Sequence, residues 1–146
     1  MEYWEQIIIA ITTGVVVTLV VFSVQYIYQT IQYWRMYTKY EGRYLVYWKS
    51  DSEREKAVFE TTICVRRNVF KFEGKTLVSG EATEYITGEV EMTQNLPSYG
   101  KGYYSQGKGA WGFIEWQIIE GNRIFAHQNY VDNTSFIPQS FIWHKK

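Results

Sequence analysis

The sequence predicts an all-β protein, a small antiparallel up-and-down β-barrel of about eight strands, preceded by one N-terminal transmembrane helix. Three observations predict this fold. A long apolar stretch without charge opens the chain, short segments of alternating polarity fill the rest, and turn-forming residues separate those segments. We therefore expect a transmembrane helix with an interfacial extension at 1–38 and a barrel domain at 39–146.

The stretch from Gln6 to Trp34 contains no Asp, Glu, Lys, Arg or His. At about 1.5 Å of rise per residue it forms a helix roughly 40 Å long, which crosses one hydrocarbon layer and is too short to cross two. A cleaved signal peptide is the alternative, but such a peptide begins with positive charge, whereas Glu2 and Glu5 precede this stretch. A helix buried in a soluble core is rarely apolar on all sides over this length. We expect one membrane span.

The charges beside this span predict its orientation. All 15 Lys and Arg residues follow Trp34, beginning with Arg35 and Lys39. Because basic residues concentrate on the cytoplasmic side of membrane helices, the C-terminal domain is expected in the cytoplasm. The single cysteine, Cys64, has no partner for an internal disulfide, which is typical of a reducing compartment.

Small side chains recur every four residues within the span, at Ala10, Gly14 and Thr18. This spacing places them on one helix face, where a second helix can approach closely. The sequence therefore predicts that the spans self-associate through this face and that the protein is a homo-oligomer.

Beyond residue 40 the apolar residues recur with a period of two. In Tyr85–Thr93, for example, Ile86, Val90 and Met92 share one face while Glu89 and Glu91 lie on the other. We interpret Glu73 to Lys75 as a turn between two short strands. The predicted strand segments are 40–49, 58–67, 69–72, 76–79, 85–93, 102–106, 110–119, 123–131 and 136–144.

A sheet of adjacent antiparallel strands leaves two unpaired edges unless it closes on itself. A closed barrel removes both edges, and about eight strands enclose room for side chains or one small ligand. Glycines within the strands, such as Gly88 and Gly112, suit bends or positions of close packing. A two-sheet sandwich stays open as the alternative.

Catalytic and metal-binding patterns are weak. Gly102, Gly107 and Lys108 match part of a phosphate-binding loop, but Gly109 stands where that loop has Ser or Thr, and the following segment reads as a strand rather than a helix. His127 and His144 lie far apart in the sequence, and no metal-ligand spacing appears. We expect no catalytic residues, no metal and no enzymatic activity. The 15 basic and 15 acidic residues balance, which argues against binding to duplex nucleic acid.

The barrel is rich in aromatic side chains interleaved with Arg and Lys. Aromatic faces stack on nucleobases and guanidinium groups pair with phosphates, so this inventory suits a small nucleotide. Strand packing alone also favours aromatics. Polar residues whose strand parity points inward are the better candidates, and we expect Ser140 to be one if Phe136 and Ile142 face the lumen. The candidate ligand-binding residues are Tyr44, Arg67, Tyr104, Trp116, Gln128 and Ser140, with Tyr44 and Trp116 as stacking platforms.

The chain begins with a membrane segment that leads directly into an aromatic barrel. The barrel opens with Tyr-Glu-Gly-Arg-Tyr at 40–44 and closes with Phe-Ile-Trp-His-Lys-Lys at 141–146. This layout resembles the membrane-anchored β-barrel effectors of bacterial antiphage signalling. These are the effectors of CBASS and of the related Panoptes systems. The resemblance implies a barrel that binds a cyclic di- or oligonucleotide made by a partner nucleotidyltransferase. It also implies a location in the bacterial inner membrane and assembly of the spans to disrupt that membrane. Such effectors often have two spans, whereas one fits here.

Two other functions remain open from the sequence. A membrane-tethered, lipocalin-like carrier would use the same barrel for a hydrophobic ligand. A membrane scaffold would bind a protein partner through the barrel exterior.

Overall fold

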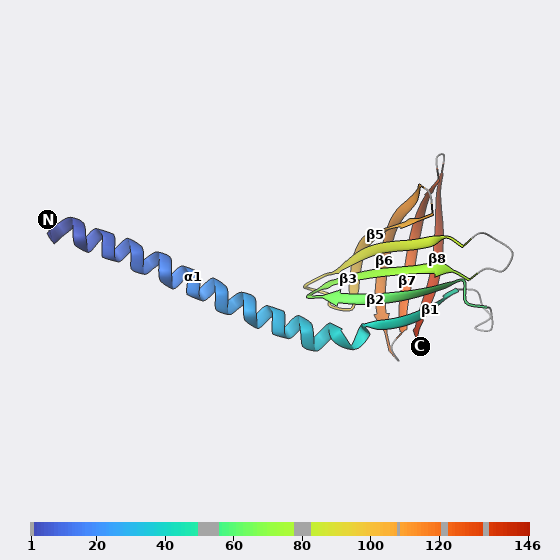
Figure 1. The fold of residues 1–146 in the computed structure, drawn as a ribbon, viewed down its shortest axis with the longest axis horizontal. Coiled ribbons are helices and arrows are strands. Elements are labelled where there is room, and N and C mark those ends of the chain that lie inside the picture. The colour runs from blue at the N-terminus through green and yellow to red at the C-terminus, as the bar shows by residue number, and fades with distance from the viewer. Residues whose placement is uncertain (1, 50–55, 78–82, 108, 121–122, 133–134) are drawn as a thin grey trace. The chain divides into compact units, whose positions relative to one another are not determined.

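The computed structural model describes residues 2–49, 56–77, 83–107, 109–120, 123–132 and 135–146. The chain forms two compact units, Met1–Met36 and Tyr37–Lys146. The first is helical, and the second is a closed β-barrel (Figure 1). The predicted fold class is therefore confirmed.

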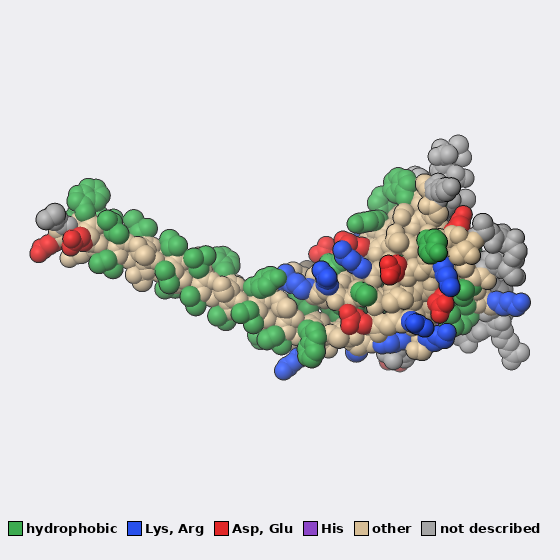
Figure 2. Space-filling model, viewed as in Figure 1, with side chains coloured by type: hydrophobic (Ala, Val, Ile, Leu, Met, Phe, Trp, Pro, Cys, Tyr) green, Lys and Arg blue, Asp and Glu red, His purple; other side chains and the backbone are tan. Residues whose placement is uncertain are grey.

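The helix α1 spans Glu2–Tyr37. Its acidic residues Glu2 and Glu5 lie in the first turn and Arg35 lies in the last, which is the arrangement that the helix dipole favours. Hydrophobic side chains cover α1 along its length between these charges (Figure 2). Among the described residues it is the one helix long and apolar enough to span a membrane.

Eight strands follow in sequence order, and each pairs antiparallel with the next, while β8 pairs with β1 to close the barrel. This arrangement leaves no unpaired sheet edge among the described strands. The strands are β1 (Gly42–Trp48), β2 (Phe59–Arg66), β3 (Val69–Thr76), β4 (Tyr85–Met92), β5 (Tyr99–Gln106), β6 (Ala110–Ile119), β7 (Arg123–Asp132) and β8 (Ser135–Lys145).

Alternation along each strand produces a core inside the barrel. On β4, Ile86, Val90 and Met92 are buried and the intervening residues are more exposed, as the sequence predicts. The same parity buries Phe59, Thr61 and Ile63 on β2. The largest buried side chains are aromatic, so the interior is filled mainly by rings.

Two predicted boundaries were wrong because glycine was interpreted as a turn signal. Strand β3 continues through Gly74 to Thr76 rather than turning at residues 73–75. Gly74 lies opposite Thr61, where an added Cβ would come within 2.3 Å of the Glu60 carbonyl oxygen. Strand β5 likewise begins at Tyr99 rather than at Gly102, and so includes Gly100, where a Cβ would come within 2.8 Å of the Glu91 carbonyl oxygen. These glycines permit close strand approach.

Tyr37 packs at the end of the barrel where the chain enters β1. Its side chain is 2% exposed, its ring meets Phe70 edge-on at 5.3 Å between centroids, and its hydroxyl donates to the Pro97 carbonyl oxygen at 2.9 Å. A short 3₁₀ turn, Thr38–Tyr40, then leads to β1. The last residue of α1 is thus part of the barrel core.

The substitution Tyr37→Phe tests this contact. It removes the hydroxyl and keeps the ring, so we expect a loss of about 1 kcal/mol in the free energy of unfolding of the barrel, since a net hydrogen bond contributes roughly that amount. Chemical denaturation followed by tryptophan fluorescence measures the loss. Tyr103→Phe on the exposed outer surface is the control and should change little; equal effects would contradict a role for the Tyr37 hydroxyl.

Candidate functional site

The barrel interior contains a continuous cluster of aromatic rings. Trp116 lies at its centre, with ring centroids 5.7 Å from Phe70, 5.5 Å from Phe72 and 4.9 Å from Trp143. Since Phe70 also contacts Tyr37, ring contacts run from the end of the barrel to Trp143. Both tryptophans are fully buried. Stacking and edge-to-face contacts of this kind stabilise the core beyond the area that they bury.

Three buried polar atoms in this interior have no hydrogen-bond partner among the described residues. They are the indole Nε1 atoms of Trp116 and Trp143 and the hydroxyl of Thr61. An indole N–H can only donate, so each tryptophan requires an acceptor. Leaving a buried polar group without a partner costs about 1–3 kcal/mol, and such groups therefore call for a water or a ligand. The two N–H groups provide donors for an acceptor within the aromatic interior.

Four of the predicted binding residues lie on the inner side of the barrel. Tyr44, Tyr104, Trp116 and Gln128 are all at most 2% exposed. The Tyr44 hydroxyl donates to the Tyr40 carbonyl oxygen at 2.8 Å. Burial, and secondarily the nearby Tyr40, raises the pKa of Tyr44 above its usual value.

Ser140 does not face the interior, and that prediction was wrong. Phe141 and Trp143 are the buried residues of this strand, so Ser140 and Ile142 lie on the outer face. The Ser140 hydroxyl contacts His127 Nδ1 at 3.1 Å, across the pairing of β7 with β8. The sequence around Ser140 is apolar at both parities, which left the face of this strand ambiguous.

Arg67 was predicted to continue the inner face of β2, but β2 ends at Arg66. Arg67 lies in the turn that joins β2 to β3 and has a φ of 57°. Its side chain is half-buried, at the same end of the barrel as Tyr37.

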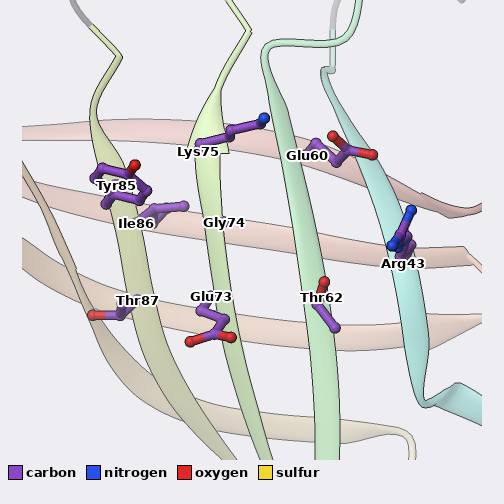
Figure 3. Close-up of a pocket in the computed structure, with 9 residues that line it drawn as sticks. All are labelled: Arg43, Glu60, Thr62, Glu73, Gly74, Lys75, Tyr85, Ile86 and Thr87. Carbon is purple, nitrogen blue, oxygen red and sulfur yellow. The ribbon is translucent and has the colours of Figure 1, made fainter.

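The outer surface carries a groove of about 540 Å³ across β1 to β4. Figure 3 shows its lining residues, Arg43, Glu60, Thr62, Glu73, Gly74, Lys75, Tyr85, Ile86 and Thr87. Strand pairing creates two rows in it, one of Glu60, Lys75 and Tyr85 and one of Thr62, Glu73 and Thr87. None of the predicted site residues lines this groove, because only the strand register brings these positions together.

The charges of this groove are mixed. Arg43 and Lys75 stand with Glu60 and Glu73, and Glu60 forms an ion pair with Lys146 at 3.5 Å. A ligand with two phosphates would meet two carboxylates here, and like charges repel. The interior instead offers uncharged N–H donors among aromatic rings, and no carboxylate is among its buried described residues.

No known protein family, curated protein or solved structure matches this chain.

The predicted assembly face lies on α1. Ala10, Gly14 and Thr18 are exposed, and the Thr18 hydroxyl donates to the Gly14 carbonyl oxygen at 2.8 Å within the helix. A Cβ added at Gly14 would meet no atom within 4 Å among the described residues, so the helix alone accepts a larger side chain there. Any restriction on size at Gly14 must come from another molecule.

The described residues contain no group of three or more His, Cys, Asp or Glu side chains placed to hold a metal ion. The partial phosphate-loop match is followed by β6 and not by a helix, as the sequence indicates. Lys108 of that match lies outside the described residues. This segment therefore lacks the helix whose N-terminus binds phosphate in such loops.

Proposed function

We propose that this protein is a membrane effector of an antiphage defence system, in which a cyclic di- or oligonucleotide binds the barrel and controls assembly of the membrane spans. The observation that supports this most is the pair of buried indole N–H donors of Trp116 and Trp143, which lack an acceptor among the described residues. Nucleotides carry base and phosphate acceptors together with flat rings that stack on aromatic side chains. The architecture also resembles membrane-anchored barrel effectors of this kind.

The contacts of Tyr37 suggest how binding could reach the membrane segment. A ligand ring that enters the aromatic cluster has to displace a ring already there, because the interior is filled. Tyr37 closes one end of the cluster and is also the last residue of α1. Displacing Tyr37 would therefore release the chain segment that leads to the span. A nucleotide can control assembly only if it binds one state of the protein more tightly than another, here the states with Tyr37 displaced and with Tyr37 packed.

In the proposed arrangement α1 spans the bacterial inner membrane once, with the barrel in the cytoplasm. The basic residues that follow Trp34 support this orientation. A partner nucleotidyltransferase would supply the ligand in the same compartment.

Titration calorimetry tests the proposed ligand. We expect the full-length protein in lipid nanodiscs to bind at least one member of a panel of cyclic di- and trinucleotides. Trp143→Phe removes one N–H donor and keeps an aromatic ring, and it should weaken binding about tenfold, since one hydrogen bond contributes roughly 1–1.5 kcal/mol.

Trp111→Phe is the matched control, because Trp111 lies on the outer face and is 49% exposed. Its affinity should equal that of the unaltered protein. Binding of fatty acids in place of nucleotides would favour a lipocalin-like carrier. If both variants bind nucleotide with equal affinity, the binding site lies outside the barrel interior.

Exposed aromatic side chains favour a second candidate, a membrane scaffold that binds a protein. Tyr103, Trp111 and Phe113 lie on neighbouring outer positions of β5 and β6 and are 49–57% exposed. Aromatic residues are enriched in protein interfaces. A scaffold would bind no nucleotide and would lose its partner when Trp111 and Phe113 are replaced by serine.

A further inference from the structure

Basic side chains gather at the end of the barrel where the chain enters from α1. Strand β1 begins at this end, β2 ends and β3 begins here, and β7 begins and β8 ends here. The basic residues at these positions are Lys39, Arg66, Arg67, Arg123 and Lys145. We call this set the basic rim.

Backbone and side-chain contacts join part of the rim. Lys145 Nζ donates to the Lys39 carbonyl oxygen at 2.7 Å, and Arg123 pairs in the sheet with His144, the neighbour of Lys145. Arg66 and Arg67 flank the turn into β3. Lys39 and Arg66 are exposed, while the other three are half-buried.

The two ends of the barrel differ in charge. Three acidic residues lie at the same end as the five basic residues of the rim. Two of these acidic side chains accept hydrogen bonds: Glu41 from the Val65 N–H at 2.9 Å and Glu91 from Asn68 at 3.3 Å. The third is Glu120. At the other end the connecting sequences at 49–56, 77–84 and 107–109 together contain five acidic and four basic residues, and 49–56 alone is balanced. The rim is therefore the positive end.

Chain length limits how far the rim can lie from a membrane that α1 spans. Lys39 lies five positions after Trp34, the last residue of the uncharged stretch. Even fully extended, five residues reach no more than about 18 Å. Whatever the angle between helix and barrel, Lys39 and the adjoining Lys145 remain near the headgroups. Leu96 and Pro97 belong to the loop at this same end, and Leu96 is 59% exposed.

We infer that the basic rim docks the barrel on anionic lipid headgroups, with Leu96 entering the interface. The inference rests on the membrane anchoring in the proposed function and is independent of the nucleotide. Each Lys or Arg near an anionic leaflet contributes attraction that falls off over a Debye length. Docking would hold the barrel in one orientation at the membrane surface. A displacement of Tyr37 would then move the chain that leads to α1 relative to a barrel held in place.

Depth-dependent quenching tests the docking. The full-length protein carries a fluorophore at position 96 through Leu96→Cys in a Cys64→Ser background, and headgroup spin-labelled lipids quench it in nanodiscs. We expect strong quenching when phosphatidylglycerol is present and weak quenching in phosphatidylcholine alone. Replacing Lys39, Arg66 and Arg123 by glutamine should lower the ratio of docked to undocked protein roughly 100-fold. Equal quenching in both lipids would overturn the proposal.

A matched control replaces Lys49, Lys56 and Lys75 by glutamine, which removes the same charge from outside the rim; quenching should persist. If the rim variant fails to fold, the salt dependence of the labelled protein replaces it, and quenching unaffected by high salt would overturn docking. Extraction of the unaltered protein by alkaline carbonate would instead refute the anchoring in the proposed function. Nucleotide titrations on the same samples report that function separately.

Discussion

Replacing Gly14 by leucine is expected to abolish the membrane toxicity that the proposed function implies while leaving ligand affinity unchanged. A leucine side chain fits on α1 itself, since no described atom lies within 4 Å of the added Cβ. It would, however, separate two helices that pack through the Ala10, Gly14 and Thr18 face. Growth of bacteria that express the full-length protein with a cognate nucleotidyltransferase measures toxicity, and calorimetry measures affinity.

Val16→Leu is the control for this substitution. Two helical positions from Gly14, it lies on the opposite side of α1 and is 52% exposed. Growth arrest should persist with Val16→Leu and disappear with Gly14→Leu. Toxicity that survives Gly14→Leu would show that the spans assemble through another face.

Replacing Trp116 by alanine is expected to destabilise the barrel by about 3–5 kcal/mol, the usual cost of removing a large buried aromatic side chain. Trp116 is completely buried and contacts Phe70, Phe72 and Trp143, so its removal leaves a cavity in the middle of the ring cluster. The melting temperature of the barrel should fall by at least about 10 °C. Differential scanning calorimetry of the full-length protein in nanodiscs measures this fall.

Trp116→Phe is the conservative control, with an expected cost of about 1–2 kcal/mol, because a ring still fills most of the space. Trp111→Ala, on the exposed outer face, should cost less still. If Trp116→Ala melts at the temperature of the unaltered protein, the interior is not the packed cluster described above.

The sequence predicted the barrel because most strands place apolar and polar residues on separate faces. The same alternation predicted the face of the polar residue Gln128, because Ile124 and Ala126 precede it at the same parity, and all three are buried. The pattern failed on β8, where both faces are apolar around Ser140. There the inner face is determined by pairing, since Trp143 lies opposite Val46 on β1 and Ile124 on β7. The pairing register of a strand depends on its neighbours and cannot be predicted from the sequence of that strand alone.

Contacts that form only when the barrel closes could not be predicted from the sequence either. Tyr37 appeared to belong to the membrane-interface segment, yet it packs on Phe70 and bonds to Pro97, which is 60 residues away. The outer groove was missed for the same reason, because Glu60, Lys75 and Tyr85 meet only through the pairing of three strands. The glycines at 74 and 100 resembled turn signals, although both permit close contact between strands.

Dye release from vesicles that contain the full-length protein tests the central claim, that a nucleotide in the barrel controls the membrane segment. Addition of the cyclic nucleotide that binds most tightly should change the rate of release, and this change should be lost in Gly14→Leu and weakened in Trp143→Phe. An identical rate with and without bound nucleotide in the unaltered protein would contradict the claim.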